Sequence, residues 1–210
     1  MLPKVAPALG RIAPKIVVGY SDASALLGWL TSRHGWVTFH GPMVASDLPE
    51  LGAADARSLV RTLRGDPPPA LRVRGVLHTG SGEGRLVGGC LSVVVALLGT
   101  PYALDLRGAV LFLEDVAEPP YRLDRMLTQL LQSGALRGVR AVVFGEMARC
   151  GTPGAVKRVL AEQTASLRVP VLFGAPSGHG RGKRTLPFGI RVRVDGTRRT
   201  VEFLERCTAT

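Results

Sequence analysis

The sequence has few cysteines and few aromatic residues, and each scarcity argues against a class of protein. Its three cysteines, Cys90, Cys150 and Cys207, are an odd number without the spacing of metal ligands. Reduced, unpaired thiols explain them better than a disulfide framework or a structural metal site. Aromatic residues make up only 5% of the 210 residues, so basic positions have few aromatic neighbours of the kind that nucleic-acid surfaces use.

Long apolar runs are also missing. The stretch from Leu91 to Leu98 is far too short to span a bilayer, and the start, Met1 to Lys4, has no apolar core of a signal peptide. We therefore expect a cytoplasmic protein without a membrane partner.

Acidic residues are scarce relative to basic ones: 16 Asp and Glu stand against 27 Lys and Arg, a formal net charge of +11. The basic residues are scattered, and their longest cluster is only 181–184. We interpret the charge as a surface bias and expect no nucleic-acid partner; a basic nucleic-acid-binding module is the weakest functional alternative. With 46% apolar residues, the chain can bury a core and fold as a globule.

The residues 15–27 form the most informative stretch. A β-branched run ends at Gly19, Ser21 follows two residues later, and a helix-like pattern begins at Ala23. This arrangement is typical of a nucleophile elbow, whose tight turn needs small residues two before and two after the serine. The N–H of Asp22 would then lie at a helix N-terminus, where it can stabilise an oxyanion. The alternative is that Ser21 or Asp22 simply caps the helix.

The remaining pattern predicts an α/β fold in two parts. Residues 1–14 have no sustained period and predict an irregular lead-in, after which strand, helix and strand alternate up to the proline-rich break at 65–69. We place a domain boundary there. This gives a truncated parallel βα domain in 1–69 and a second α/β domain with a mixed sheet in 70–210, closed by a hairpin over 190–204.

Two further segments carry candidate polar residues. Glu114 and Asp115 end the apolar strand 109–113, at the edge where layered α/β proteins place active sites, although the pattern alone favours a solvated loop. His179 lies between two glycines on a loop after another strand, where an imidazole can act as a general base. The glycine-rich segment 80–84 lacks the ending of a phosphate-binding loop, and we predict a turn there. No spacing among these residues predicts a metal or cofactor site.

Several motifs together resemble the LD-carboxypeptidase family over residues 15 to about 195. They occur in the family's order: 15–22, 38–43, 88–92, 98–102, 111–116, 121–130, 178–180 and 185–189. The resemblance implies a cytoplasmic serine carboxypeptidase of cell-wall recycling that cleaves the LD peptide bond of murein-derived tetrapeptides. A muropeptide stem would be its small peptide substrate, and a homodimer is one expectation for its assembly. Self-immunity peptidases that cleave microcin-type conjugates are the related alternative.

The resemblance also implies roles for individual residues. Ser21 would be the nucleophile, His179 the general base and Glu114 the carboxylate that orients it, with the Asp22 N–H as an oxyanion donor. These residues are spread over most of the sequence, so the fold must assemble them.

Two departures from the family pattern stand out. The family has a long portion before the elbow that supplies a second oxyanion donor, so we expect an N-terminally truncated, weakly active or degenerate member. Cys90 also occupies a position where the family usually has Asn after two glycines, and this exchange removes two donors and an acceptor near the expected cleft.

Overall fold

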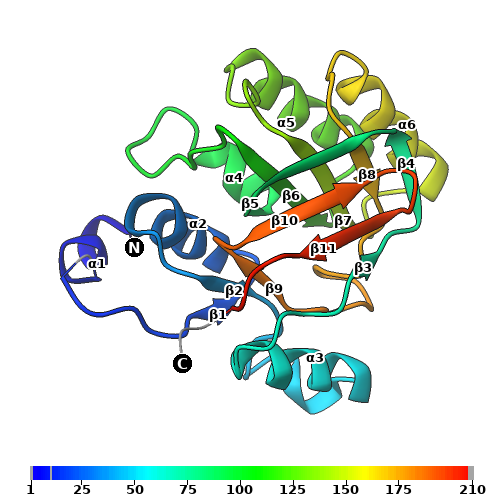
Figure 1. Cartoon of the computed structure of the whole chain (residues 1–210). Coiled ribbons are helices and arrows are strands. Elements are labelled where there is room, and N and C mark those ends of the chain that lie inside the picture. The colour runs from blue at the N-terminus through cyan, green and yellow to red at the C-terminus, as the bar shows by residue number, and fades with distance from the viewer. Residues whose placement is uncertain (1, 10, 208–210) are drawn as a thin grey trace.

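The computed structural model describes residues 2–9 and 11–207, which form two β-sheets with helices packed around them (Figure 1). The helices are α1 (Leu2–Leu9), α2 (Ala23–His34), the short 3-10 helix η1 (Leu48–Glu50), α3 (Ala53–Leu63), α4 (Leu91–Ala96), α5 (Pro120–Gln132) and α6 (Pro153–Thr164). The strands are β1 (Val18–Gly19), β2 (Thr38–His40), β3 (Leu71–Arg72), β4 (Gly75–His78), β5 (Ser81–Cys90), β6 (Ala109–Val116), β7 (Ala141–Ala148), β8 (Val171–Phe173), β9 (Leu186–Phe188), β10 (Arg191–Asp195) and β11 (Thr200–Phe203).

The larger sheet has eight strands in the order β3-β11-β10-β5-β6-β7-β8-β4. Its centre, β5 to β8, is parallel, and the strands on either side are antiparallel. The predicted closing hairpin is confirmed, because β10 and β11 pair around the turn that follows Asp195. The mixed α/β class expected from the sequence is therefore confirmed.

Side-chain alternation along β6 divides the interior into two cores. Val110 and Phe112 belong to the core that faces the smaller sheet, whereas Leu111 and Leu113 belong to the core beneath α4, α5 and α6. Figure 1 shows these three helices together on one side of the larger sheet. Because both faces of β6 are covered, its sequence is apolar throughout 109–113 and its C-terminal end lies deep inside the molecule.

The smaller sheet has the order β1-β2-β9. β1 and β2 are parallel, as a strand–helix–strand unit requires, and β9 pairs antiparallel to β2 with Phe188 opposite Thr38. Residues from both sides of the proline-rich break at 65–69 thus share one sheet. The division of the chain into 1–69 and 70–210 stays a prediction.

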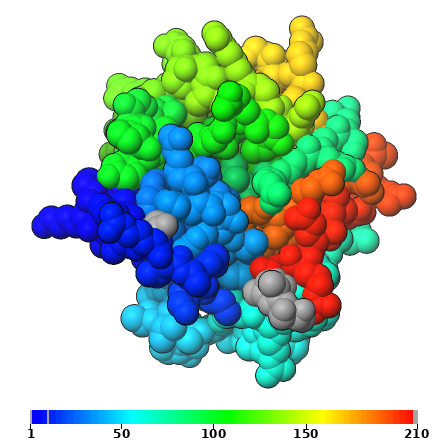
Figure 2. Space-filling model, turned by 60° about the vertical axis from the view of Figure 1, so that its left-hand side comes forward, coloured from blue at the N-terminus to red at the C-terminus, as the bar shows by residue number. Residues whose placement is uncertain are grey.

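The N-terminal segment differs from the expectation of an irregular lead-in, because Leu2–Leu9 forms the helix α1. Pro3 lies in its first turn, where no N–H is needed. Leu2 is buried against Trp29, Leu30 and Trp36, so apolar packing stabilises a helix whose short sequence shows no period. In the space-filling view the N-terminal residues lie beside those of α2 (Figure 2).

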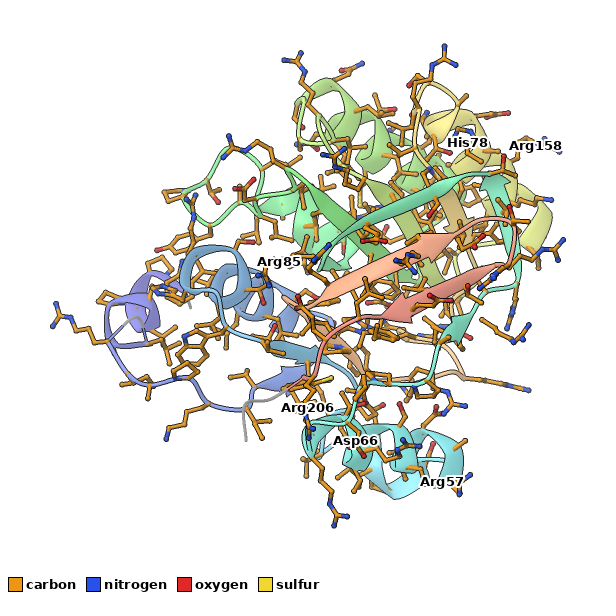
Figure 3. The ribbon with its side chains drawn as sticks, in the orientation of Figure 1. Arg57, Asp66, His78, Arg85, Arg158 and Arg206 are labelled. Carbon is orange, nitrogen blue, oxygen red and sulfur yellow. The ribbon has the colours of Figure 1, made fainter. Side chains whose placement is uncertain are left out.

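Charged side chains extend from many parts of the surface (Figure 3). Arg57 on α3 and Arg158 on α6 lie at opposite ends of the molecule in this view, and Arg206 lies near the C-terminus. Among the described residues, no helix is both long and apolar enough to cross a membrane.

The glycine-rich segment 80–84 is mostly strand rather than the predicted turn, because β5 begins at Ser81. Glycines keep this strand close to its neighbours. At Gly88 the backbone has φ +146°, and an added Cβ would meet the carbonyl of Phe112 on β6. The strand therefore tolerates no side chain at that position.

We expect Gly88→Ala to lower the free energy of unfolding by about 2–5 kcal/mol, through left-handed strain and overpacking against β6. Gly154→Ala is the matched control, since Gly154 lies in α6 with nothing within 4 Å of an added Cβ. It should be neutral or stabilising by up to about 1 kcal/mol. Urea unfolding measures both changes; equal stability of the two variants would contradict this account.

Candidate active site

Ser21 lies on a sharp turn between β1 and α2, as the elbow pattern predicted. Its φ of 59° places it in the left-handed region, where a non-glycine residue is strained and often functional. An added Cβ at Gly19 would lie 2.8 Å from the Cβ of Ala23. The turn therefore requires the small residues on either side of the serine.

The capping alternative receives no support from the structure. Asp22 is the N-cap of α2, but its side chain makes no capping hydrogen bond. Within residues 2–9 and 11–207, the Ser21 hydroxyl has no hydrogen-bond partner, and the Asp22 N–H donates to no acceptor. Both groups remain available to a ligand at the helix N-terminus.

Glu114 and His179 are brought together by the fold. The Nδ1 of His179 lies 2.7 Å from Glu114 Oε2, and the His179 backbone N–H donates to the same oxygen at 3.0 Å. Because a carboxylate only accepts, the ring donates through Nδ1, and Nε2 is left free to accept a proton. The solvated-loop explanation of Glu114 is wrong, since its side chain is 0% exposed.

The pairing of β6 with β7 is irregular at this carboxylate. Between the pairs Leu113–Phe144 and Asp115–Met147, two residues of β7 stand opposite Glu114 alone, so β7 bulges at this point. Bulges re-aim single side chains next to active sites. The neighbouring Asp115 is directed elsewhere, because its carboxylate accepts from the N–H groups of Ser92 and Val116, both at 2.8 Å.

His40 is a site residue to which the sequence analysis gave no role, although it lies in the motif 38–43. It ends β2, is 1% exposed, and places Nε2 3.5 Å from Glu114 Oε1. That approach is an ion-pair contact without hydrogen-bond geometry, and neither atom has a hydrogen-bond partner in the described part of the chain. The other ring nitrogen, Nδ1, lies 3.4 Å from the hydroxyl of Ser177. One carboxylate thus faces two imidazoles.

These two rings keep Glu114 ionised. Burial opposes the charge, but the hydrogen bond from His179 and the nearby His40 outweigh it and lower the pKa of Glu114 to about 2. A carboxylate that is charged at neutral pH can orient an imidazole and stabilise its protonated form.

A second polar cluster connects the elbow to the loop that carries His179. The Nζ of Lys183 lies 2.8 Å from Asp47 Oδ1 and 3.3 Å from the hydroxyl of Tyr20, which donates to Asp47 at 3.0 Å. Although burial opposes ionisation, Lys183 and the Met43 N–H lower the pKa of Asp47. The Tyr20 ring meets the His179 ring edge-on, with centroids 4.7 Å apart. Tyr20, the residue before Ser21, thus contacts the ring of His179, while no hydrogen bond joins the Ser21 hydroxyl to His179 among the described residues.

Cys90 lies behind this site, at the end of β5. Its N–H donates to the Ser24 hydroxyl at 3.0 Å, and its Sγ lies 3.4 Å from Asp115 Oδ1. Burial raises the pKa of the Cys90 thiol to about 12, so the group stays protonated at neutral pH and is a poor nucleophile.

The three cysteines are free and buried. Among the described residues no group of three His, Cys, Asp or Glu side chains could hold a metal ion.

The fold and this geometry define a class: an α/β protein with a buried carboxylate–imidazole pair and a serine on an elbow, the elements that serine hydrolases use. Residues 83–194 match the model of the LD-carboxypeptidase C-terminal domain, and residues 1–41 match that of the N-terminal domain. The chain belongs to the LD-carboxypeptidase family.

Individual relatives agree with this assignment. A Streptomyces coelicolor protein named as a carboxypeptidase is 39% identical over 90% of this chain and 62% of its own length. The murein tetrapeptide carboxypeptidase of Pseudomonas aeruginosa is 34% identical over 90% of this chain and 66% of its own. The chain therefore spans less than two thirds of the length of these relatives.

Solved structures share the fold. The muramoyltetrapeptide carboxypeptidase of Oxalobacter formigenes matches with a TM-score of 0.80 and 32% identity, over 90% of this chain and 67% of that one. The self-immunity protein MccF, in complex with glutamyl sulfamoyl guanosine, matches with a TM-score of 0.81 and 23% identity, over 93% of this chain and 69% of that one. At this identity the match supports the fold alone.

The depressed pKa of Glu114 predicts how stability responds to acid. A carboxyl group whose pKa is lower in the folded state than in the unfolded state stabilises the fold when it is ionised. For Glu114 this stabilisation is complete above the unfolded-state pKa of 4.5, and it is lost as the pH falls toward the folded-state pKa of about 2. We expect the free energy of unfolding to fall between these pH values, and to fall less in Glu114→Gln. Urea unfolding at several pH values checks this; identical slopes for both proteins would contradict it.

Proposed function

We propose that this chain is a serine carboxypeptidase that cleaves the LD peptide bond of murein-derived tetrapeptides through an acyl-enzyme. The observation that carries the proposal is the 2.7 Å contact between His179 Nδ1 and buried Glu114, together with an elbow serine whose hydroxyl is unpaired in the described part of the chain. Membership of the family and the names of the relatives support the substrate class.

In the proposed reaction His179 Nε2 removes the proton of the Ser21 hydroxyl as its oxygen attacks the peptide carbonyl. Glu114 holds the ring through Nδ1 and stabilises the charge that the ring gains. The ring then returns the proton to the leaving amine, which departs as the free D-amino acid. Water, activated by the same imidazole, hydrolyses the ester and releases Ser21.

The carbonyl oxygen becomes negative when Ser21 attacks it. The Asp22 N–H can donate a hydrogen bond to this oxygen. It lies at the N-terminus of α2 and has no acceptor of its own in the described structure. A donor of this kind contributes a factor of about 100–1000 to the rate. Its position directly after the nucleophile is the one that elbow serines use.

We expect Ser21→Ala to abolish release of D-alanine from a murein tetrapeptide, because no other hydroxyl occupies the elbow. His179→Ala and Glu114→Gln should lower turnover about 10³–10⁴-fold or more. The control is Ser81→Ala, an exposed serine at the start of β5. Turnover that survives Ser21→Ala would remove the serine mechanism.

The same assay tests the related alternative. Aspartyl and glutamyl sulfamoyl nucleosides are bound in MccF structures, and a relative named as the Escherichia coli microcin C7 self-immunity protein is 25% identical over 94% of this chain. Preferential cleavage of such a nucleoside over the tetrapeptide would favour a self-immunity role.

His40 has a positioning role in this proposal, since it faces the Glu114 oxygen that His179 leaves free. We expect His40→Phe to lower kcat about 10-fold with little change in KM, because the variant loses the polar ring that lies 3.5 Å from the Glu114 carboxylate. His40→Gln retains a donor and should recover part of the loss. A kcat that is unchanged in His40→Phe, or no difference between the two variants, would contradict this role.

A further inference from the structure

A pocket of about 410 Å³ lies at the carboxyl ends of β7 and β8, against α6. We propose that it binds a carboxylate-bearing part of the peptide substrate, so that this enzyme selects anionic peptides. The inference rests on the proposed function and extends it to substrate recognition. Its volume is within the range of small-ligand sites.

The position of the pocket connects it to the candidate active site. β6 and β7 are parallel neighbours, so the pocket opens at the same edge of the sheet as Glu114. Ligands in α/β proteins bind outside the carboxyl ends of the strands. Gly180 and Arg181, which directly follow His179, form part of its wall. A peptide held here would therefore lie next to the loop that carries the base.

This wall is fixed by Glu146 at the end of β7. The Glu146 N–H donates to the Ser177 carbonyl at 3.0 Å, and its carboxylate accepts from the Gly182 N–H at 3.4 Å. Asp47 holds the far end of the loop through Lys183. Because the loop is anchored at both ends, the pocket is formed before any ligand arrives.

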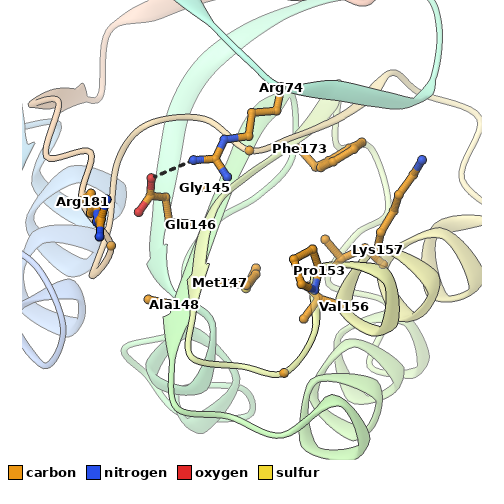
Figure 4. A pocket seen from close by; sticks show the side chains of 14 residues that line it. Arg74, Gly145, Glu146, Met147, Ala148, Pro153, Val156, Lys157, Phe173 and Arg181 are labelled. Atoms are coloured by element: carbon orange, nitrogen blue, oxygen red, sulfur yellow. Dashed lines mark ion pairs between the residues drawn. The ribbon is translucent and has the colours of Figure 1, made fainter.

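The lining combines an apolar floor with positive side chains. Figure 4 shows Met147, Val156 and Phe173 in the pocket, with Lys157 and Arg181 on opposite sides of it. Arg74 lies 3.7 Å from Glu146, whereas Lys157 and Arg181 have no acidic partner among the described residues.

The charges decide which ligand fits. Three cations and one carboxylate leave an excess of positive charge around an apolar floor. An anionic group beside an apolar chain satisfies both features, whereas a cationic ligand would be repelled. Peptides with free carboxylates, such as murein stem peptides, have this chemistry.

Binding to the Ser21→Ala protein, measured by calorimetry at low salt, separates recognition from cleavage. We expect Lys157→Gln or Arg181→Gln to weaken binding of a murein tetrapeptide about two- to fivefold, and the double variant about tenfold. High salt should reduce these differences. The matched control is Arg158→Gln, an exposed arginine of the same helix that points away at the edge of the molecule (Figure 3).

A tetrapeptide whose carboxylates are amidated should bind weakly and equally to all variants. Equal affinities of Lys157→Gln, Arg181→Gln and Arg158→Gln for the free acid, or no binding of the tetrapeptide, would overturn the pocket assignment. If the affinities are equal but the unmodified chain cleaves the tetrapeptide and Ser21→Ala does not, the pocket assignment fails and the proposed function stands. Binding without cleavage by the unmodified chain would instead overturn the function and keep the pocket.

Discussion

The contact between Glu114 and His179 is the constraint on which the site depends. A carboxylate that is 0% exposed is costly to ionise unless donors surround it. Here two donors converge on one oxygen, the ring and the backbone N–H of His179, and the ring of His40 from another segment lies 3.5 Å from the second oxygen. Each of these segments must be in place before the charge is tolerated, so the charge and the fold stabilise each other.

This requirement explains why the two sheets cannot be treated separately at the site. Glu114 comes from the centre of the larger sheet, and His40 from the end of β2 in the smaller one. β9 pairs with β2 directly after the His179 loop and returns the chain toward β10. The rings of His40, Phe112 and Phe188 pack together at this junction, with centroids 5.2–6.2 Å apart. Apolar packing thus sets the distance between the carboxylate and its second imidazole.

Much of this arrangement could be predicted from the sequence, and the exceptions have physical reasons. The apolar strand at 109–113 and the elbow at Ser21 follow from local patterns. His40 could not be found in this way, because its role exists only once β2 and β6 face each other. Its place in the motif 38–43 was the available signal. The Tyr20–Asp47–Lys183 cluster joins segments that are distant in sequence, so no local spacing reveals it.

The wrong predictions share a cause as well. The turn expected at 80–84 is a strand because pairing with β10 outweighs the low strand preference of glycine. The lead-in is a helix because Leu2 finds a tertiary partner in Trp29 and its neighbours. In both cases a contact with a remote element decides the local structure. The same holds for the pair at the site, since Glu114 belongs to β6 and His179 to a loop that Asp47 and Glu146 anchor through contacts with remote elements.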